Sequence, residues 1–128
     1  MRTPKRKTGS AAEPADERRE RELLRGMLAG DDDSFETVMV LHGAQVTRLA
    51  RRYLCNEADA AECVQDTFLK VFQNIASFER RSSLWTWIRR IAINECLMRL
   101  RQIKRRAEED IEELLPVFDE SGSRVDPS

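Results

Sequence analysis

Two segments of opposite charge, each with the apolar spacing of a helix, occupy residues 56–106 and constrain the fold more than any other part of the chain. The first, 57–75, is rich in acids and amides, and the second begins near residue 84. Residues 80–106 contain nine Lys or Arg and one acid, whereas 107–128 contain eight acids and one Arg, so the net charge of −1 conceals two opposed blocks. A basic surface with aromatic residues beside it is typical of nucleic-acid binding, and the acidic helix before it indicates a separate partner.

Apolar residues recur at helical spacing along most of the chain, and the alternation of a half-buried strand is scarce. We therefore predict an all-α fold, a compact bundle of about four helices with one modest core. The predicted organisation is a flexible basic tail over 1–15, a helical domain over 16–106 and an acidic linker over 107–128.

The first predicted helix, 16–29, ends at Gly30. Asp33 is predicted to cap the second helix, with Glu36 as its partner in a capping box. One face of that second helix is predicted to lie in the core and carries Phe35, Met39, His42, Val46, Leu49, Ala50 and Tyr53. Because His42 belongs to this stripe, we interpret it as a packed core residue rather than a catalytic one.

The third predicted helix, about 57–75, has two distinct faces. The predicted buried face holds Val64, Phe68, Val71 and Ile75, and the opposite face holds Glu62, Asp66, Leu69 and Gln73, with Gln65 at its edge. An exposed Leu framed by carboxylates and amides fits either a partner-binding face or a solvated one. Ser82 or Ser83 is predicted to cap the fourth helix, which runs from about Leu84 to at least Arg101 and ends by Pro116.

The sequence also argues against several classes of protein. Cys55, Cys63 and Cys96 lack the spacing of a zinc site, so we interpret them as buried thiols in a reducing compartment. No apolar run reaches the roughly 20 residues of a membrane span, and the N-terminus lacks a secretion signal, so we predict a cytoplasmic location without membrane insertion. No nucleotide-binding Gly loop, nucleophile elbow or catalytic carboxylate pair is present, and we predict neither an enzyme nor a metal or cofactor site.

The stretch DAAECVQDTFLKVFQNIASFERRSSLWTWIRRIAINECLMRLR resembles region 2 of the sigma-70 family, the domain of bacterial sigma factors that binds polymerase and melts the promoter. The resemblance covers about 31–106 and is closest to the extracytoplasmic-function (ECF) group. The matching positions are Asp59, Ala60, Glu62, Gln65, Asp66, Phe68, Leu69, Phe72, Phe78, Ser82, Ser83, Thr86, Trp87, Ile88, Ile91, Ala92 and Asn94. Three positions depart from the family pattern: Arg80 replaces a usual Gly, Leu84 a usual Phe and Met98 a common Asp.

The resemblance implies two partners, core RNA polymerase and promoter DNA. The third helix is expected to dock on a coiled coil of the largest polymerase subunit through Glu62, Gln65, Asp66, Leu69 and Phe72. The loop 78–83 is expected to capture an unstacked base of the non-template strand, while the fourth helix holds phosphates. The implied DNA-binding residues are Phe78, Arg80, Arg81, Ser82, Ser83, Trp87, Arg89, Arg90, Asn94, Arg101, Lys104 and Arg105. Core packing is the alternative for Phe72 and Trp87, and simple solvent exposure is the alternative for Asn94.

Family members normally continue through an acidic linker into a second helical domain, and this chain stops inside what resembles that linker. The sequence therefore predicts either a truncated member or an isolated domain of a transcription initiation factor. The alternative function is an interaction module that binds polymerase or an anti-sigma factor and cannot initiate transcription alone. A non-specific DNA-binding protein is a third reading, and the acidic helix argues against it. The acidic tail is interpreted as a solvated linker, a mimic of nucleic acid, or a segment that folds back on the basic helix.

Overall fold

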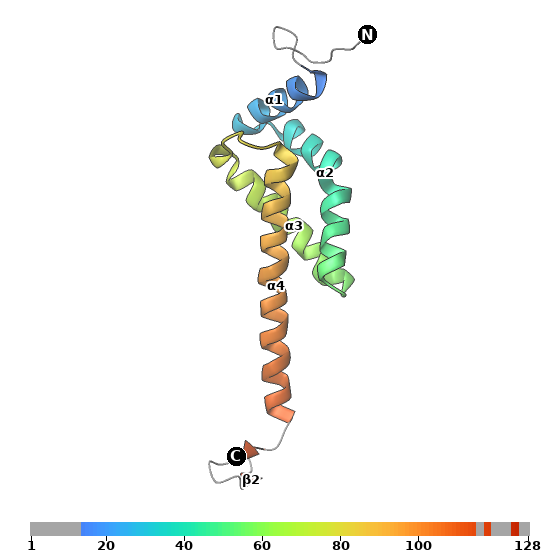
Figure 1. Ribbon diagram of the computed structural model, residues 1–128, viewed down its shortest axis with the longest axis vertical. Coiled ribbons are helices and arrows are strands. Elements are labelled where there is room, and N and C mark those ends of the chain that lie inside the picture. Colours follow the sequence, from blue (N-terminus) through green and yellow to red (C-terminus); the bar gives the residue numbers. More distant parts are fainter. Residues whose placement is uncertain (1–13, 115–116, 119–123, 126–128) are drawn as a thin grey trace, which may run out of the picture.

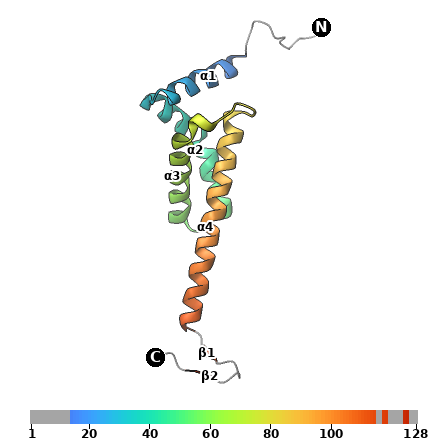
Figure 2. The same ribbon diagram turned by 90° about the vertical axis from the view of Figure 1, so that its left-hand side faces the viewer.

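The computed structural model describes residues 14–114, 117–118 and 124–125. The helices are α1 (Ala15–Leu28), α2 (Asp32–Tyr53), α3 (Glu57–Gln73), the 3₁₀ helix η1 (Ile75–Ser77) and α4 (Leu84–Leu114); the strands β1 (Val117–Phe118) and β2 (Arg124–Val125) form one antiparallel pair. Helices α2, α3 and α4 pack side by side, α1 crosses one end of them, and α4 projects far beyond the others at the opposite end (Figures 1 and 2). The predicted helical bundle is therefore confirmed.

The predicted flanking segments are described only in part. The N-terminal tail, 1–15, lies almost wholly outside the described residues. The predicted acidic linker begins as helix, because α4 continues to Leu114 and stops two residues before Pro116. None of the described helices is long and apolar enough to cross a membrane.

The turn between α1 and α2 fixes the start of α2. Gly30 has a φ of +79°, a conformation that Gly adopts without steric cost, and the Asp31 N–H donates to the Gly26 carbonyl at 2.9 Å. The chain then becomes extended at Asp31, whose side chain accepts a hydrogen bond from the Ser34 N–H at 3.2 Å. The prediction of Asp33 as the cap was therefore wrong, because the turn closed by Gly30 places Asp31 at the helix boundary.

One hydrophobic core joins all four α-helices. Its buried residues are Leu24, Met27, Val38, Val46, Leu49, Phe68, Val71, Ile75, Leu84, Ile88 and Ala92. The predicted stripe on α2 is correct except at one position: Val38 is fully buried, whereas Met39 is 40% exposed. Near its start α2 packs against α1, where Val38 joins Leu24 and Met27 in the core, and this contact moves the buried arc by one residue.

A smaller cluster lies where α2, α3 and α4 meet, and it contains Cys63 and Cys96. Their Sγ atoms are 3.5 Å apart, much longer than a disulfide bond of about 2.05 Å. Burial raises the pKa of both thiols, to about 12 for Cys96, so both stay protonated near neutral pH. Cys55 is exposed at the corner between α2 and α3, so its interpretation as a buried thiol was wrong.

Candidate functional site

The exposed side of α3 carries Glu62, Gln65, Asp66 and Leu69, which we call the α3 face. The helix begins at a cap formed by Asn56, whose Oδ1 accepts a hydrogen bond from the Asp59 N–H at 3.1 Å. Leu69 is 55% exposed, and its position beside carboxylates and an amide, rather than its exposure alone, distinguishes it from the other exposed apolar residues.

Phe72 was implied as a further member of this face, with core packing as the alternative. Its side chain is partly buried, and its ring centroid lies 4.5 Å from that of Phe35 and 6.1 Å from that of Phe68. This packing supports the core alternative, and we leave Phe72 out of the α3 face.

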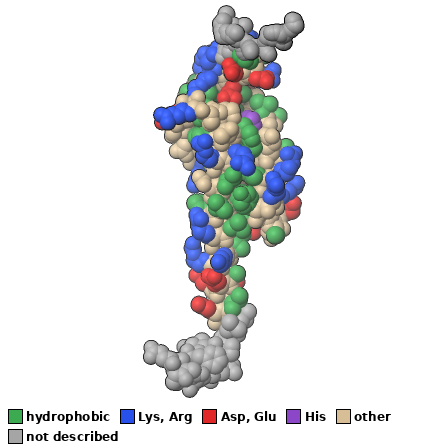
Figure 3. Space-filling view, viewed as in Figure 1, with side chains coloured by type: hydrophobic (Ala, Val, Ile, Leu, Met, Phe, Trp, Pro, Cys, Tyr) green, Lys and Arg blue, Asp and Glu red, His purple; other side chains and the backbone are tan. Residues whose placement is uncertain are grey.

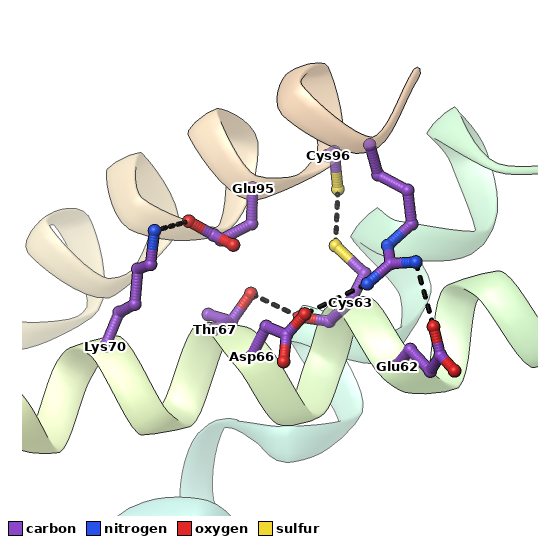
Figure 4. Close-up of polar contacts among 8 residues, drawn as sticks. Glu62, Cys63, Asp66, Thr67, Lys70, Glu95 and Cys96 are labelled. Carbon is purple, nitrogen blue, oxygen red and sulfur yellow. Dashed lines mark hydrogen bonds and ion pairs between the residues drawn. The ribbon is translucent and has the colours of Figure 1, made fainter. Parts of the chain in front are cut away.

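Arg99 of α4 binds both carboxylates of the α3 face. Its Nη1 donates to Glu62 Oε1 at 2.8 Å and its Nη2 donates to Asp66 Oδ2 at 2.9 Å. Desolvation lowers the pKa of Arg99, but the hydrogen bond to Asp66 and the charges of both carboxylates outweigh it, so the pKa is raised and the guanidinium stays charged. Figure 4 shows Glu62 and Asp66 at the edge of α3 that borders α4, near Cys63.

A second ion pair crosses the same helix seam one turn further along. Lys70 Nζ lies 2.8 Å from Glu95 Oε2, and the Glu95 side chain is only 8% exposed (Figure 4). Sequence reasoning missed both Arg99 and Glu95 as partners of α3. A signal was present, since Glu95 lies three residues after the buried Ala92 and Arg99 three residues after the buried Cys96. Charged residues on a buried ridge require partners, because an unpaired buried charge is costly.

A cavity of about 330 Å³ lies between α3 and α4 beside the Lys70–Glu95 pair, and we call it the α3–α4 pocket. It is lined by Lys70, Asn74, Ser77, Trp87, Ile91, Asn94, Glu95 and Met98. An aromatic wall with a few amide and charged groups suits a flat ring that has a hydrogen-bonding edge. Two residues that the sequence assigned to DNA binding, Trp87 and Asn94, are thus brought together. Trp87 is partly buried, and its ring centroid lies 5.2 Å from that of Phe78.

The loop 78–83 is anchored at its end by capping contacts. The Thr86 N–H donates to Ser83 Oγ at 3.1 Å, which confirms Ser83 as the cap of α4. The Leu84 N–H donates to Glu20 Oε2 of α1 at 3.0 Å, so α1 also holds the start of α4. Ser82 Oγ donates to the Ser83 carbonyl at 3.3 Å. Both serines assigned to DNA are therefore engaged in holding the loop.

Arg80 departs from the family pattern at a position where the backbone favours Gly. Its φ is +62°, and it is the one residue other than Gly with a positive φ in the described part of the chain. Arg80 and Phe78 line a second cavity, of about 260 Å³, together with Arg21, Leu24, Arg25, Leu28, Ile75 and Ala76. Four of the predicted DNA-binding residues thus line cavities, Trp87 and Asn94 in the α3–α4 pocket and Phe78 and Arg80 in this second one. Arg81, also assigned to DNA, is exposed and pairs with Glu79 at 3.2 Å.

Replacing Arg80 by Gly is expected to raise the free energy of unfolding by about 0.5–1 kcal/mol. The left-handed conformation costs a residue with a Cβ about 1–2 kcal/mol, and the greater freedom of Gly in the unfolded chain offsets part of that gain. Urea denaturation followed by circular dichroism measures the change. Arg81→Gly is the matched control, because Arg81 has no positive φ, and it should not stabilise. Equal effects of the two variants would contradict the prediction.

The remaining basic residues assigned to DNA lie exposed along α4. They are Arg89, Arg90, Arg101, Lys104 and Arg105. Figure 3 shows Lys and Arg side chains beside the bundle and along α4, and Asp and Glu side chains replacing them toward the lower end of that helix. Arg89 and Arg90 fall within the stretch 87–98 of α4 that lines the α3–α4 pocket, and the other three basic residues follow this stretch toward the projecting end of the helix.

These helices match a known family. The Sigma-70 region 2 profile matches residues 39–106, and the chain belongs to the sigma-70 family as a region 2 domain. Its relatives place it in the ECF group. ECF RNA polymerase sigma factor SigM of Mycobacterium tuberculosis is 35% identical over 103 residues, which cover 80% of this chain and 53% of SigM. SigW of Bacillus subtilis is 32% identical over 75 residues, which cover 59% of this chain and 40% of SigW. The chain thus spans about half the length, or less, of these relatives.

A solved structure supports the same fold. The NMR structure of an engineered region 2 of sigmaE in complex with GTAAAA is similar at a TM-score of 0.63 and 29% sequence identity. The similarity covers 68% of this chain and 90% of the sigmaE chain. The relationship therefore extends from sequence pattern to helix arrangement.

Proposed function

We propose that this chain is the part of an ECF sigma factor that binds core RNA polymerase through the α3 face and opens promoter DNA through α4. The observation that carries the proposal is an exposed Leu beside two carboxylates on α3, together with a ring-sized pocket against α4, the helix that carries the exposed arginines. The role is that of a transcription initiation factor rather than an enzyme, and it places the protein in the bacterial cytoplasm with the polymerase.

The α3 face fits a partner that is both apolar and basic. Leu69 offers an apolar anchor, and Glu62 and Asp66 remain 64% and 45% exposed even though Arg99 binds them. A coiled coil of the largest polymerase subunit is the expected partner. Charge complementarity would steer the encounter and select against acidic surfaces.

The α3–α4 pocket fits one unstacked base of the non-template strand. Extruding a base from a duplex costs a few kcal/mol, and stacking on an aromatic side chain returns about 1–3 kcal/mol. Trp87 offers the stacking surface, and the amide of Asn94 can bond to the edge of the base. The complex of the sigmaE neighbour with GTAAAA is consistent with this assignment. In this proposal the loop 78–83 lies beside the base rather than around it, and Arg80 gives the loop its own preference for the adjacent nucleotide.

The function is tested with two binding measurements on this chain. Labelled protein is titrated with core RNA polymerase, and separately with a single-stranded oligonucleotide and its duplex. We expect direct binding to polymerase and tighter binding to the single strand than to the duplex. Failure to bind polymerase, or a preference for the duplex, would overturn the proposal.

The basic flank of α4 should make DNA binding dependent on salt. For a single strand, each neutralised phosphate contributes about −0.7 to the slope of log affinity against log salt. Replacing both Arg101 and Arg105 by Gln is expected to flatten the slope by up to about 1.4 and to weaken binding to all sequences alike. The matched control is the double replacement of Arg51 and Arg52, two exposed arginines on α2, by Gln. An unchanged slope in the α4 variant would exclude these two phosphate contacts.

A further inference from the structure

Arg99 binds the two carboxylates that the proposed function gives to a partner. We propose that Arg99 is a positioning residue for polymerase docking: its guanidinium fixes Glu62 and Asp66 as a pair in the orientation that a basic side chain of the partner meets. This inference rests on the proposed function and adds to it a residue of α4, the helix assigned to DNA.

The geometry of the trio suits this role. The Arg99 side chain is only 20% exposed, whereas Glu62 and Asp66 are 64% and 45% exposed, so Arg99 reaches the carboxylates from the side of the bundle. Each carboxylate gives one oxygen to Arg99, Oε1 in Glu62 and Oδ2 in Asp66. The second oxygen of each carboxylate accepts no hydrogen bond from a described residue and remains for an incoming cation.

Arg99 holds the carboxylates of Glu62 and Asp66 in a fixed orientation before the partner binds. Glu62 and Asp66 lie four residues apart, so one planar guanidinium with several N–H donors can bind both, which the single ammonium of Lys does less well. Long side chains that are mobile before binding lose rotamer freedom when a complex forms, and this loss weakens affinity. Holding the two carboxylates in place beforehand removes much of that cost from the docking step.

Whether removing Arg99 weakens or tightens polymerase binding distinguishes a positioning role from simple electrostatic attraction. Removing Arg99 doubles the net negative charge of the trio, and Coulomb attraction alone would then tighten binding to a basic partner. Loss of positioning predicts the opposite, weaker binding with faster dissociation. The two explanations therefore give different outcomes for one substitution.

The first experiment compares Arg99→Met with Arg51→Met in the complete chain. Arg51 is the matched control because it also pairs with a carboxylate of α3, Glu57, at 2.9 Å, and both side chains of that pair are largely exposed. Association and dissociation with core RNA polymerase are followed by surface plasmon resonance. We expect Arg99→Met to weaken binding by about tenfold, mainly through dissociation, and Arg51→Met to change it little. Unchanged or tighter binding by Arg99→Met would overturn the inference.

A double-mutant cycle excludes a general structural effect. In a chain with both Glu62→Gln and Asp66→Asn, adding Arg99→Met should leave polymerase affinity unchanged, because Arg99 acts only through these carboxylates. A further tenfold loss of affinity in that background would overturn the inference.

Arg99→Lys keeps the charge and should recover part of the affinity that Arg99→Met loses. Thermal unfolding identifies a temperature at which all variants are folded, and binding is compared there. If the parent chain does not bind polymerase, the proposed function itself fails. If the parent chain binds and Arg99→Met does not weaken binding, only the proposed role of Arg99 fails.

Discussion

Replacing Leu69 by Arg is expected to weaken binding to core RNA polymerase by about 100-fold while the domain stays folded. Leu69 is 55% exposed, so its side chain contributes little to the core. An apolar anchor at the centre of an interface typically contributes 2 kcal/mol or more, and an Arg facing a basic partner adds repulsion. Titration of labelled polymerase measures the affinity, and circular dichroism checks the helical content.

Leu41→Arg is the matched control for that experiment. Leu41 is 46% exposed on α2, so the same residue type is replaced by the same charge at a similar exposure on another helix. We expect this variant to bind polymerase as the parent does. Comparable weakening by both variants would show that added positive charge, rather than the α3 face, governs binding.

The second large effect is expected at Trp87. Replacing Trp87 by Ala should weaken binding to single-stranded DNA by about 10- to 100-fold, because the stacking surface for one base is removed from the α3–α4 pocket. The probe is the tightest-binding member of a randomised single-stranded library, tested intact and with one base removed at each position in turn. The parent should lose affinity sharply when one particular base is absent, and Trp87→Ala should not distinguish that oligonucleotide from the intact one.

Trp85→Ala is the control for lost aromatic packing. Trp85 is partly buried and stacks on His42 at 5.5 Å, but it does not line the α3–α4 pocket. We expect Trp85→Ala to lower stability yet to keep the sharp response to the missing base. If it loses that response while Trp87→Ala keeps it, the pocket is wrongly assigned.

The sequence predicted the elements that follow from local patterns. Helical spacing indicated the α3 face, and the polar residues before the fourth helix indicated Ser82 or Ser83 as its cap. The sequence analysis wrongly predicted Asp33 as the cap of α2 and Met39 as a core residue, because both features depend on how α1 packs against α2. A pattern along one helix shows which residues share a face but not which neighbour covers that face.

The same limit explains why the interhelical ion pairs were missed. Arg99 was one of many basic residues on its helix. The spacing of residues along α4 does not show that α3 packs against it, or that Glu62 and Asp66 of α3 lie opposite Arg99. Lys70 and Glu95 are likewise 25 positions apart in sequence yet 2.8 Å apart in space. The cavity lined by Phe78 and Arg80 was beyond prediction for a further reason, since it depends on the path of the loop 78–83, in which Arg80 has a positive φ.

The unbroken length of α4 has a consequence for any strand bound along it. The helix holds 31 residues, a rod of about 46 Å at 1.5 Å per residue. Its basic residues come before 107 and its acids follow at Glu108, Glu109, Asp110 and Glu112, so the sign of the charge reverses along one stiff axis. As long as α4 stays helical, these acids cannot fold back on the basic part of the same helix, and in this structure they do not cover it. Instead they form a boundary that repels phosphates, and a nucleic-acid backbone that follows α4 from the pocket must turn away from the helix near Arg106.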